Sequence, residues 1–220
     1  MSAREISNTQ RRAIKLTMQV MAKTQVRMTM KSMGKSPSLS QVLDRLKAFD
    51  GRYIASHSTM VGFMACAIAS QMEWGSEGTF HKLSLAAFLH DITLDNHKLA
   101  QCNSLMEVEA GGFTKQEMGE FKTHTIKAAE IASTFQEVPP DVDVIIAQHH
   151  ERPDGTGFPR KLMSSYIAPL SCVFIIAHDL AQFAIAKGPG FQVSEFLTGM
   201  KGKYKSAQFR KVLDAMDKLA

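Results

Sequence analysis

The sequence predicts an all-α fold, and three observations support this prediction. Apolar residues gather in runs of helical length, and no stretch shows the alternation that is typical of a half-buried strand. Glycine and proline separate these runs, and Ser or Thr residues suited to capping precede several of them. With 220 residues, the chain is long enough for one sizeable core. We therefore expect an N-terminal helical extension at residues 1–36 and one helical domain at residues 37–220.

The N-terminal segment is rich in Met, Thr, Gln, Lys and Arg. Its methionines fall near helical spacings at Met18, Met21, Met28, Met30 and Met33. This pattern favours an amphipathic helix that packs on the domain or on a protein partner; a signalling helix once joined to an upstream sensor is the alternative. The segment has no aromatic residue to stack on a base, which disfavours binding to a nucleic acid polymer. Residues 35–40 break this helix and can cap the next one.

Two apolar helices should follow, and each carries a histidine. Residues 52–74 form a long apolar run interrupted by His57, which alone would more often be a core residue than a ligand. Thr79 is expected to cap a second helix, residues 80–92, which closes on His90 and Asp91. An ionised carboxylate at the end of an apolar helix is costly unless it is paired or bound to a cation. The adjacent His and Asp therefore indicate a site.

Three later helices add further candidates. Thr114 and Glu117 form a capping box that opens the first of them, and Pro169 opens the last. Their candidate residues are His124, His149, His150, His178 and Asp179. The chain beyond residue 188 reads as two short surface helices with solvated charged faces.

Seven residues from these helices form a candidate metal-binding set. They are His57, His90, Asp91, His124, His149, His150 and Asp179. Five imidazoles and two carboxylates are enough for two transition metal ions, with positions left for water and substrate. His and Asp ligands without thiolate suit iron, manganese or zinc better than magnesium or calcium. Two ions about 3.5–4 Å apart would activate water and stabilise charge on a phosphoester.

The stretch HHERPDGTGFP, residues 149–159, continues from two of these histidines into a loop. Asp154 is expected to fix the turn by accepting backbone N–H groups, and Gly155 and Gly157 allow close approach of the chain or a substrate. Arg152 and Lys161 could meet a phosphate or a guanine, or could be solvated loop charges. The structural residues of the loop are Asp154, Phe158 and Pro159.

Composition adds weaker indications. The excess of 26 Lys+Arg over 21 Asp+Glu gives a net charge of +5, but much of it lies at the two ends of the chain. Cys66, Cys102 and Cys172 lack a CxxC spacing and resemble small buried residues in a reducing compartment. No run reaches the ~18 uninterrupted apolar residues of a membrane span, and the N-terminus lacks a signal layout. We expect a cytoplasmic protein with no membrane partner.

The order of these motifs resembles the HD-GYP family of the HD phosphohydrolase superfamily. The resemblance rests on His57, the LHD string with His90 and Asp91, His124, the HHERPDGTGFP string and a later helical Asp, and it covers roughly residues 50–185. It implies an HD-domain-type helical bundle around a binuclear or trinuclear metal centre, often of iron, that hydrolyses cyclic di-GMP through a metal-bound hydroxide. It also implies that the seven residues above are the ligands, with Asp91 bridging the ions and acting with His90 in catalysis.

The chain departs from the family pattern at several positions. Phe158 replaces the tyrosine of the GYP signature, and Leu94 replaces a lysine that would touch a substrate phosphate. Losing that charge should cost on the order of 1–3 kcal/mol. Tyr53 stands where trinuclear members carry a glutamate, so we expect two divalent ions, with iron the first expectation and manganese or zinc the alternatives.

The last ligand is ambiguous by one residue. An ungapped count from the loop gives His178, whereas the Pro169–Leu170 match, with one residue inserted, gives Asp179. We expect Asp179, because a carboxylate is what the family pattern offers. The departures also keep a second function open: a weak or inactive signalling module that responds to a cyclic dinucleotide and acts through protein contacts.

Overall fold

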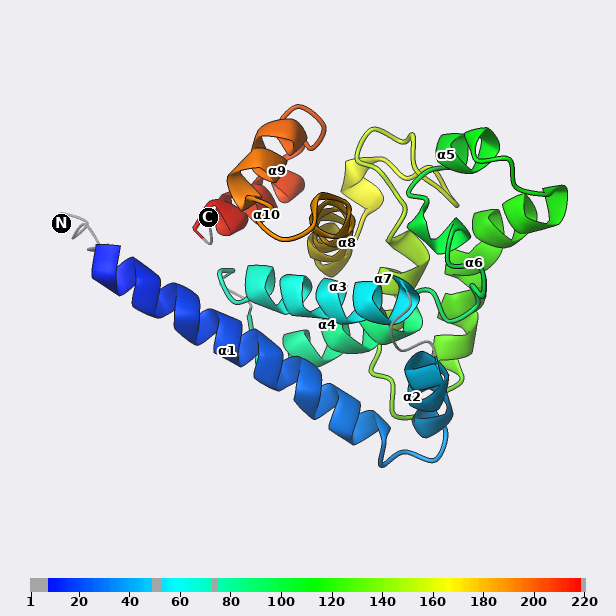
Figure 1. Cartoon of the computed structure of the whole chain (residues 1–220), viewed down its shortest axis with the longest axis horizontal. Coiled ribbons are helices and arrows are strands. Elements are labelled where there is room, and N and C mark those ends of the chain that lie inside the picture. Colours follow the sequence, from blue (N-terminus) through cyan, green and yellow to red (C-terminus); the bar gives the residue numbers. More distant parts are fainter. Residues whose placement is uncertain (1–7, 49–52, 73–74, 219–220) are drawn as a thin grey trace.

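The computed structural model describes residues 8–48, 53–72 and 75–218, and within these ranges it contains helices and no strand (Figure 1). The helices are α1 (Asn8–Met33), α2 (Leu39–Ala48), α3 (Tyr53–Ala69), α4 (Glu77–Leu89), α5 (Leu105–Ala110), α6 (Lys115–Ser133), α7 (Val142–Gln148), α8 (Pro169–Lys187), α9 (Val193–Met200) and α10 (Ala207–Asp217). Two short 3₁₀ turns, η1 (Leu99–Gln101) and η2 (Ser164–Tyr166), complete the described elements. The all-α prediction is confirmed.

Helices α3, α4 and α8 form the centre of the bundle, with α3 packed against both others (Figure 1). Helix α8 is long and apolar enough to cross a membrane by length and composition alone, but 67% of its most apolar 18-residue stretch is buried inside the protein. Its apolar surface packs on α3, α7 and α10, as expected for a helix that is hydrophobic all round. Polar groups on these helices are consequently enclosed by the core.

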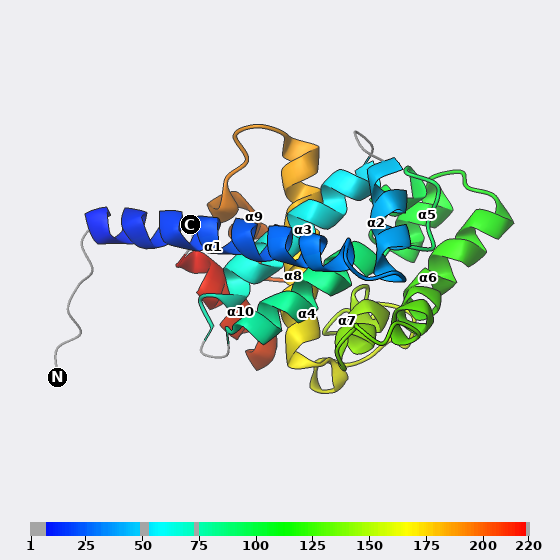
Figure 2. The ribbon, with the colours of Figure 1, turned by 90° about the horizontal axis from the view of Figure 1, so that it is seen from below.

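The N-terminal helix packs on the domain along its second half. Ala22, Val26 and Met33 are buried, and α1 contacts α3 and α4. Val20 and Met28 are exposed, and the first turns of α1 extend past the ends of α3 and α4 (Figures 1 and 2). The predicted contributions of Met18 and Met21 lie outside the described side chains. The division at residues 36 and 37 stays a prediction.

The N-termini of α6 and α8 begin as predicted from the sequence, but the predicted cap of α4 is corrected. Thr114 caps α6 in a complete capping box, and Pro169 occupies the first turn of α8. The cap of α4, however, is Ser76, whose hydroxyl accepts the backbone N–H of Thr79. Thr79 therefore lies inside the first turn, because the side chain three residues earlier already satisfies its N–H.

The two C-terminal helices are more buried than predicted. α9 and α10 pack against α8, with Phe196, Phe209 and Met216 in the main core (Figure 1). Tyr204, in the connection between them, is fully buried. Their charged faces are solvated, but their apolar faces close one side of the bundle.

Candidate metal centre

Six buried imidazoles and one buried carboxylate meet inside the bundle. They are His57 from α3, His90 and Asp91 after α4, His124 from α6, His149 and His150 after α7, and His178 from α8. None of these residues is more than 4% exposed. Burying so many ionisable groups is costly unless partners or cations compensate. The cluster therefore has the composition of a metal centre.

The cluster divides into two imidazole groups on either side of Asp91. His57, His90 and His178 form one group, and His124, His149 and His150 form the other; within each group the potential ligand atoms lie within 4.8 Å of one another. Asp91 Oδ2 is 3.1 Å from His90 Nε2, whereas Oδ1 is 3.5 Å from His124 Nε2 and 3.8 Å from His149 Nε2. The two carboxylate oxygens thus face different groups, as a carboxylate shared by two ions would require.

Backbone carbonyls orient three of the imidazoles. The Nδ1 atoms of His90, His124 and His149 lie 2.5–2.8 Å from the carbonyl oxygen three residues earlier in each helix. An Nδ1–H that donates to this carbonyl leaves Nε2 with a lone pair, which is the usual arrangement behind a metal ligand. The helices themselves therefore select the tautomer that coordination needs.

Several atoms in the cluster have no hydrogen-bond partner. They are His57 Nε2, His90 Nε2, Asp91 Oδ1, His150 Nδ1 and His178 Nδ1. A buried acceptor without a partner costs about 1–3 kcal/mol. Coordination of a cation would satisfy these atoms together, so the donor set fits the divalent metal ions that the family resemblance implies.

Burial keeps four of the imidazoles neutral. It lowers the pKa of His57 to about 3 and lowers the pKa of His149, His150 and His178 well below the ordinary value. Burial by itself would raise the pKa of Asp91, but the facing His90 ring and the other imidazoles hold it below its usual range. Near neutral pH the site offers neutral nitrogen donors and an ionised carboxylate, the forms that bind metal.

Tyr53 separates the cluster from a cavity of about 530 Å³. Its ring stacks on that of His57 with centroids 5.1 Å apart, and its hydroxyl lies 3.3 Å from His57 Nδ1. The same residue lines the cavity together with Gln182, Phe183 and Lys203. Burial raises the pKa of the Tyr53 phenol, so the hydroxyl stays protonated. Tyr53 therefore lines the cavity and also contacts the cluster through His57.

Asp179, the expected last ligand, belongs to a different network. Its carboxylate accepts hydrogen bonds from Arg152 at 3.0 Å, Asn103 at 2.7 Å and the Tyr204 hydroxyl. It is absent from the metal-binding groups of the described residues, whereas His178 is present. Consecutive helical residues point about 100° apart, and in α8 His178 faces the cluster whereas Asp179 faces Arg152, Asn103 and Tyr204. The geometry favours His178, the alternative given by the ungapped count.

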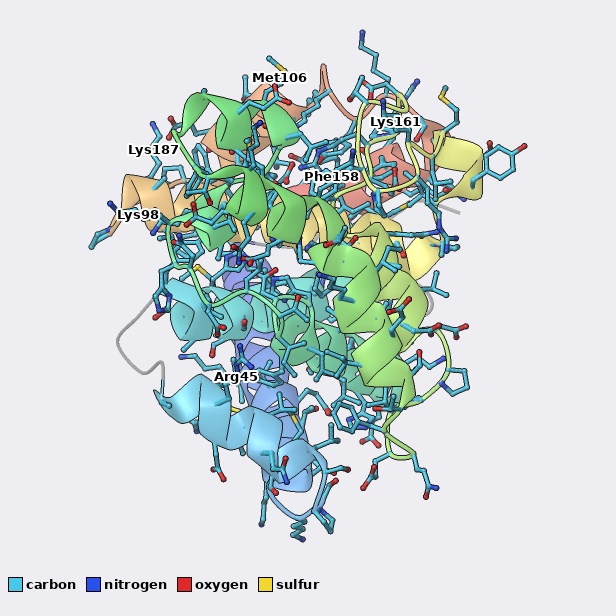
Figure 3. The ribbon with its side chains drawn as sticks, turned by 90° about the vertical axis from the view of Figure 1, so that its right-hand side faces the viewer. Arg45, Lys98, Met106, Phe158, Lys161 and Lys187 are labelled. Atoms are coloured by element: carbon cyan, nitrogen blue, oxygen red, sulfur yellow. The ribbon has the colours of Figure 1, made fainter. Side chains whose placement is uncertain are left out.

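The two expected loop cations lie in different environments. Arg152 was expected at a phosphate or in solvent, but it is 8% exposed and paired with Asp179. Lys161 is exposed on the loop at the edge of the molecule, which corresponds to the solvated alternative (Figure 3). The buried ion pair explains Arg152, because a buried guanidinium needs a carboxylate partner.

The rest of the loop is held by groups close to it in sequence. Asp154 accepts the backbone N–H and the hydroxyl of Thr156, which is the local bonding expected of it. Gly155 has φ +75°, and a Cβ on Gly157 would lie 2.3 Å from the Arg152 nitrogen. Glu151, not singled out from the sequence, is fully buried and accepts the backbone N–H groups of residues 160 and 162. Its position directly after His149 and His150 is the sequence feature that could have identified it.

Two of the departures from the family pattern, Phe158 and Leu94, share one apolar cluster. The Phe158 ring stacks on His150 with centroids 4.7 Å apart and lies 5.2 Å from Phe121. Leu94 is 3% exposed and belongs to the same group of buried side chains. Both residues therefore supply packing beside the metal ligands, and position 94 supplies no positive charge.

Comparisons with known proteins agree with this fold. The HD domain family pattern matches residues 6–192. Over 135 residues the chain is 31% identical to the cyclic di-GMP phosphodiesterase PA4108 of Pseudomonas aeruginosa, a match that covers 61% of this chain and 31% of that protein. Its fold is similar to that of Bd1817, a HDG"Y"P protein from Bdellovibrio bacteriovorus, with a TM-score of 0.56 and 21% identity over 75% of this chain and 53% of the other.

The helical bundle and its histidine–aspartate cluster thus define an HD-domain protein, and the chain belongs to the HD domain family, within its HD-GYP group. The chain spans about a third of the curated relative and about half of the solved one.

Proposed function

We propose that this chain is a metal-dependent phosphodiesterase that hydrolyses cyclic di-GMP. The observation that carries the proposal is the Asp91 carboxylate, whose two oxygens face separate groups of buried imidazoles. The relative PA4108 is a cyclic di-GMP phosphodiesterase by name, which supports the choice of substrate. The expected ions are two divalent transition metals, iron first and manganese or zinc as alternatives.

In this proposal the ligands divide between the ions. His57, His90 and His178 would hold one ion, His124, His149 and His150 would hold the other, and Asp91 would be a ligand to both. When bound, such ions lower the pKa of water and stabilise charge on the oxygens of a phosphoester. The protein supplies orientation: carbonyls fix the tautomers of three ligands, and the low exposure of the whole cluster excludes bulk water.

A second function is a catalytically weak module that responds to a cyclic dinucleotide through protein contacts. Buried Leu94 motivates it, because this position offers no cation to a phosphate, and so does Phe158, which lacks the hydroxyl of the family signature. Exposed Val20 and Met28 on α1 could contact a protein partner. This function predicts metal binding and nucleotide binding without cleavage.

One preparation can test both functions. Iron-loaded protein, prepared without oxygen, is analysed for metal content and incubated with cyclic di-GMP. We expect linear dinucleotide or GMP from the wild type and a loss of metal and turnover in His150→Ala. His81→Ala is the matched control, since His81 is a partly buried histidine that belongs to none of the metal-binding groups. Metal and nucleotide binding without product would favour the second function, and the absence of any nucleotide binding would exclude both.

A further inference from the structure

The cavity beside Tyr53 is lined by a positively charged side chain, Lys203, that has no role in the proposed function. The cavity has a volume of about 530 Å³, within the usual range of 300–1,000 Å³ for small-molecule sites. Among the described residues that line it, Lys203 carries the only positive charge. Lys203 lies between α9 and α10, beyond the part of the chain that the family pattern matches, residues 6–192.

The contacts of Lys203 are weak enough for it to bind something else. Its Nζ lies 3.4 Å from Asp179 Oδ2, and its side chain is 44% exposed. Asp179 already pairs with the buried Arg152 at 3.0 Å and accepts from Asn103. Asp179 therefore keeps a full ion pair when the Lys203 ammonium turns toward the cavity.

Two carboxylates, Asp179 and Glu107, also line the cavity, and each is engaged by other groups. Glu107 also lines the cavity, but its carboxylate accepts the backbone N–H of Asn103 at 2.6 Å and is committed to the start of α5. The hydroxyl of Tyr53, on the same wall, lies 3.3 Å from a nitrogen of His57 in the metal-binding cluster. Lys203 and Tyr53 thus line one space that an anionic ligand can occupy, and Tyr53 connects this space to the cluster through His57.

We propose that Lys203 binds a phosphate group of the substrate in this cavity, supplying the positive charge that Leu94 does not. The proposal rests on the proposed function and names the residue that holds its anionic substrate. A lysine ammonium is a compact cation with three donors, and its bonds to phosphate oxygens are stronger than neutral hydrogen bonds. The flexible side chain of Lys203 allows its ammonium group to leave Asp179 and bind the substrate phosphate.

The experiment compares three variants of the full, metal-loaded chain with cyclic di-GMP as the probe. Lys203→Met removes the charge, Lys203→Arg retains it, and Lys201→Met removes a neighbouring exposed lysine that does not line the cavity. We expect Lys203→Met to raise KM about tenfold or more, as for loss of a charge-assisted contact. Metal content and Tm should stay at the wild-type values. Lys203→Arg should restore most of the affinity, and Lys201→Met should match the wild type.

The outcomes separate this proposal from the proposed function. Wild-type turnover with an unchanged KM in Lys203→Met overturns the role of Lys203 and leaves the phosphodiesterase intact. A KM that rises equally in Lys201→Met also overturns it, because the effect would then be one of general surface charge. If the wild type binds without cleaving, the same comparison is made on Kd. A wild type that neither binds nor cleaves cyclic di-GMP defeats the proposed function and this proposal together.

Discussion

His178 and Asp179 are neighbours in α8, yet their side chains serve two different networks. The imidazole joins His57 and His90, whereas the carboxylate lies among Arg152, Asn103 and Tyr204. Arg152 in turn lies two residues after His150. The ion pair consequently ties the segment of two cluster histidines to the helix that carries His178. At this scale, adjacent residues belong to the buried cluster and to its structural support.

Asp179→Asn should therefore reduce stability and leave metal binding largely intact. The substitution keeps the shape of the side chain but leaves the buried Arg152 guanidinium without its counter-charge. Removing one partner of a buried ion pair costs about 3–5 kcal/mol. Urea unfolding should show this loss, while the metal content per folded chain stays near that of the wild type. The comparison variant His178→Asn should lose metal, while its free energy of unfolding stays near that of the wild type. Loss of metal with unchanged stability in Asp179→Asn would restore Asp179 as the ligand.

Tyr53→Phe should weaken metal binding at one half of the cluster. The hydroxyl is the group that faces Nδ1 of His57, and the variant removes it while keeping the stacked ring. Loss of such a supporting partner typically lowers metal affinity about 10–100-fold. Titration against a metal chelator should resolve one weakened and one unchanged ion. Tyr166→Phe serves as the control, because Tyr166 is 73% exposed. Equal affinities in the two variants would remove any supporting role for Tyr53.

At the scale of elements, the loop after α7 owes its shape to backbone contacts that leave no room for side chains. Gly157→Ala would place a Cβ 2.3 Å from the Arg152 nitrogen and 2.5 Å from the Glu151 Cα, so the loop must shift. Gly119→Ala, in the exposed face of α6, meets nothing within 4 Å. We expect the first variant to lower the free energy of unfolding and the second to raise it by up to about 1 kcal/mol. Denaturant unfolding measures both; a Gly157→Ala variant as stable as the wild type would contradict the crowding argument.

The sequence predicted most helices because their signals are local. These signals are the apolar runs, the capping box at Thr114 and the proline at Pro169, and each acts within a single helix. It did not predict the partner of Arg152, which lies 27 residues away, or the burial of Tyr204, because both depend on how separate helices pack. The choice between His178 and Asp179 also depends on packing, because the side of α8 that faces the cluster decides between two neighbours. The geometry favours His178, and Asp179 as the last ligand stays a prediction.

For the whole molecule, burying six imidazoles in one core ties stability to pH. In the metal-free protein, burial lowers the pKa of His57 to about 3 and holds those of His149, His150 and His178 well below their ordinary value. Between the folded and unfolded pKa values the unfolded chain binds more protons, so the free energy of unfolding falls as pH drops below about 6.5. Each such histidine contributes up to about 1.4 kcal/mol per pH unit. Urea unfolding of metal-free protein at pH 7.5, 6.5 and 5.5 should show a progressive loss.

Removing one buried imidazole should make this pH dependence shallower. In His178→Leu the side chain cannot titrate, and its apolar replacement suits a position that is 1% exposed. Below pH 6.5 the slope of unfolding free energy against pH should fall by up to about 1.4 kcal/mol per unit, the contribution of a single proton. Metal binding should shift the loss of stability to lower pH in the wild type, because protons must then displace the ions as well. An identical slope in the wild type and His178→Leu would mean that this imidazole is protonated in the folded protein, which the enclosed geometry of the cluster does not allow.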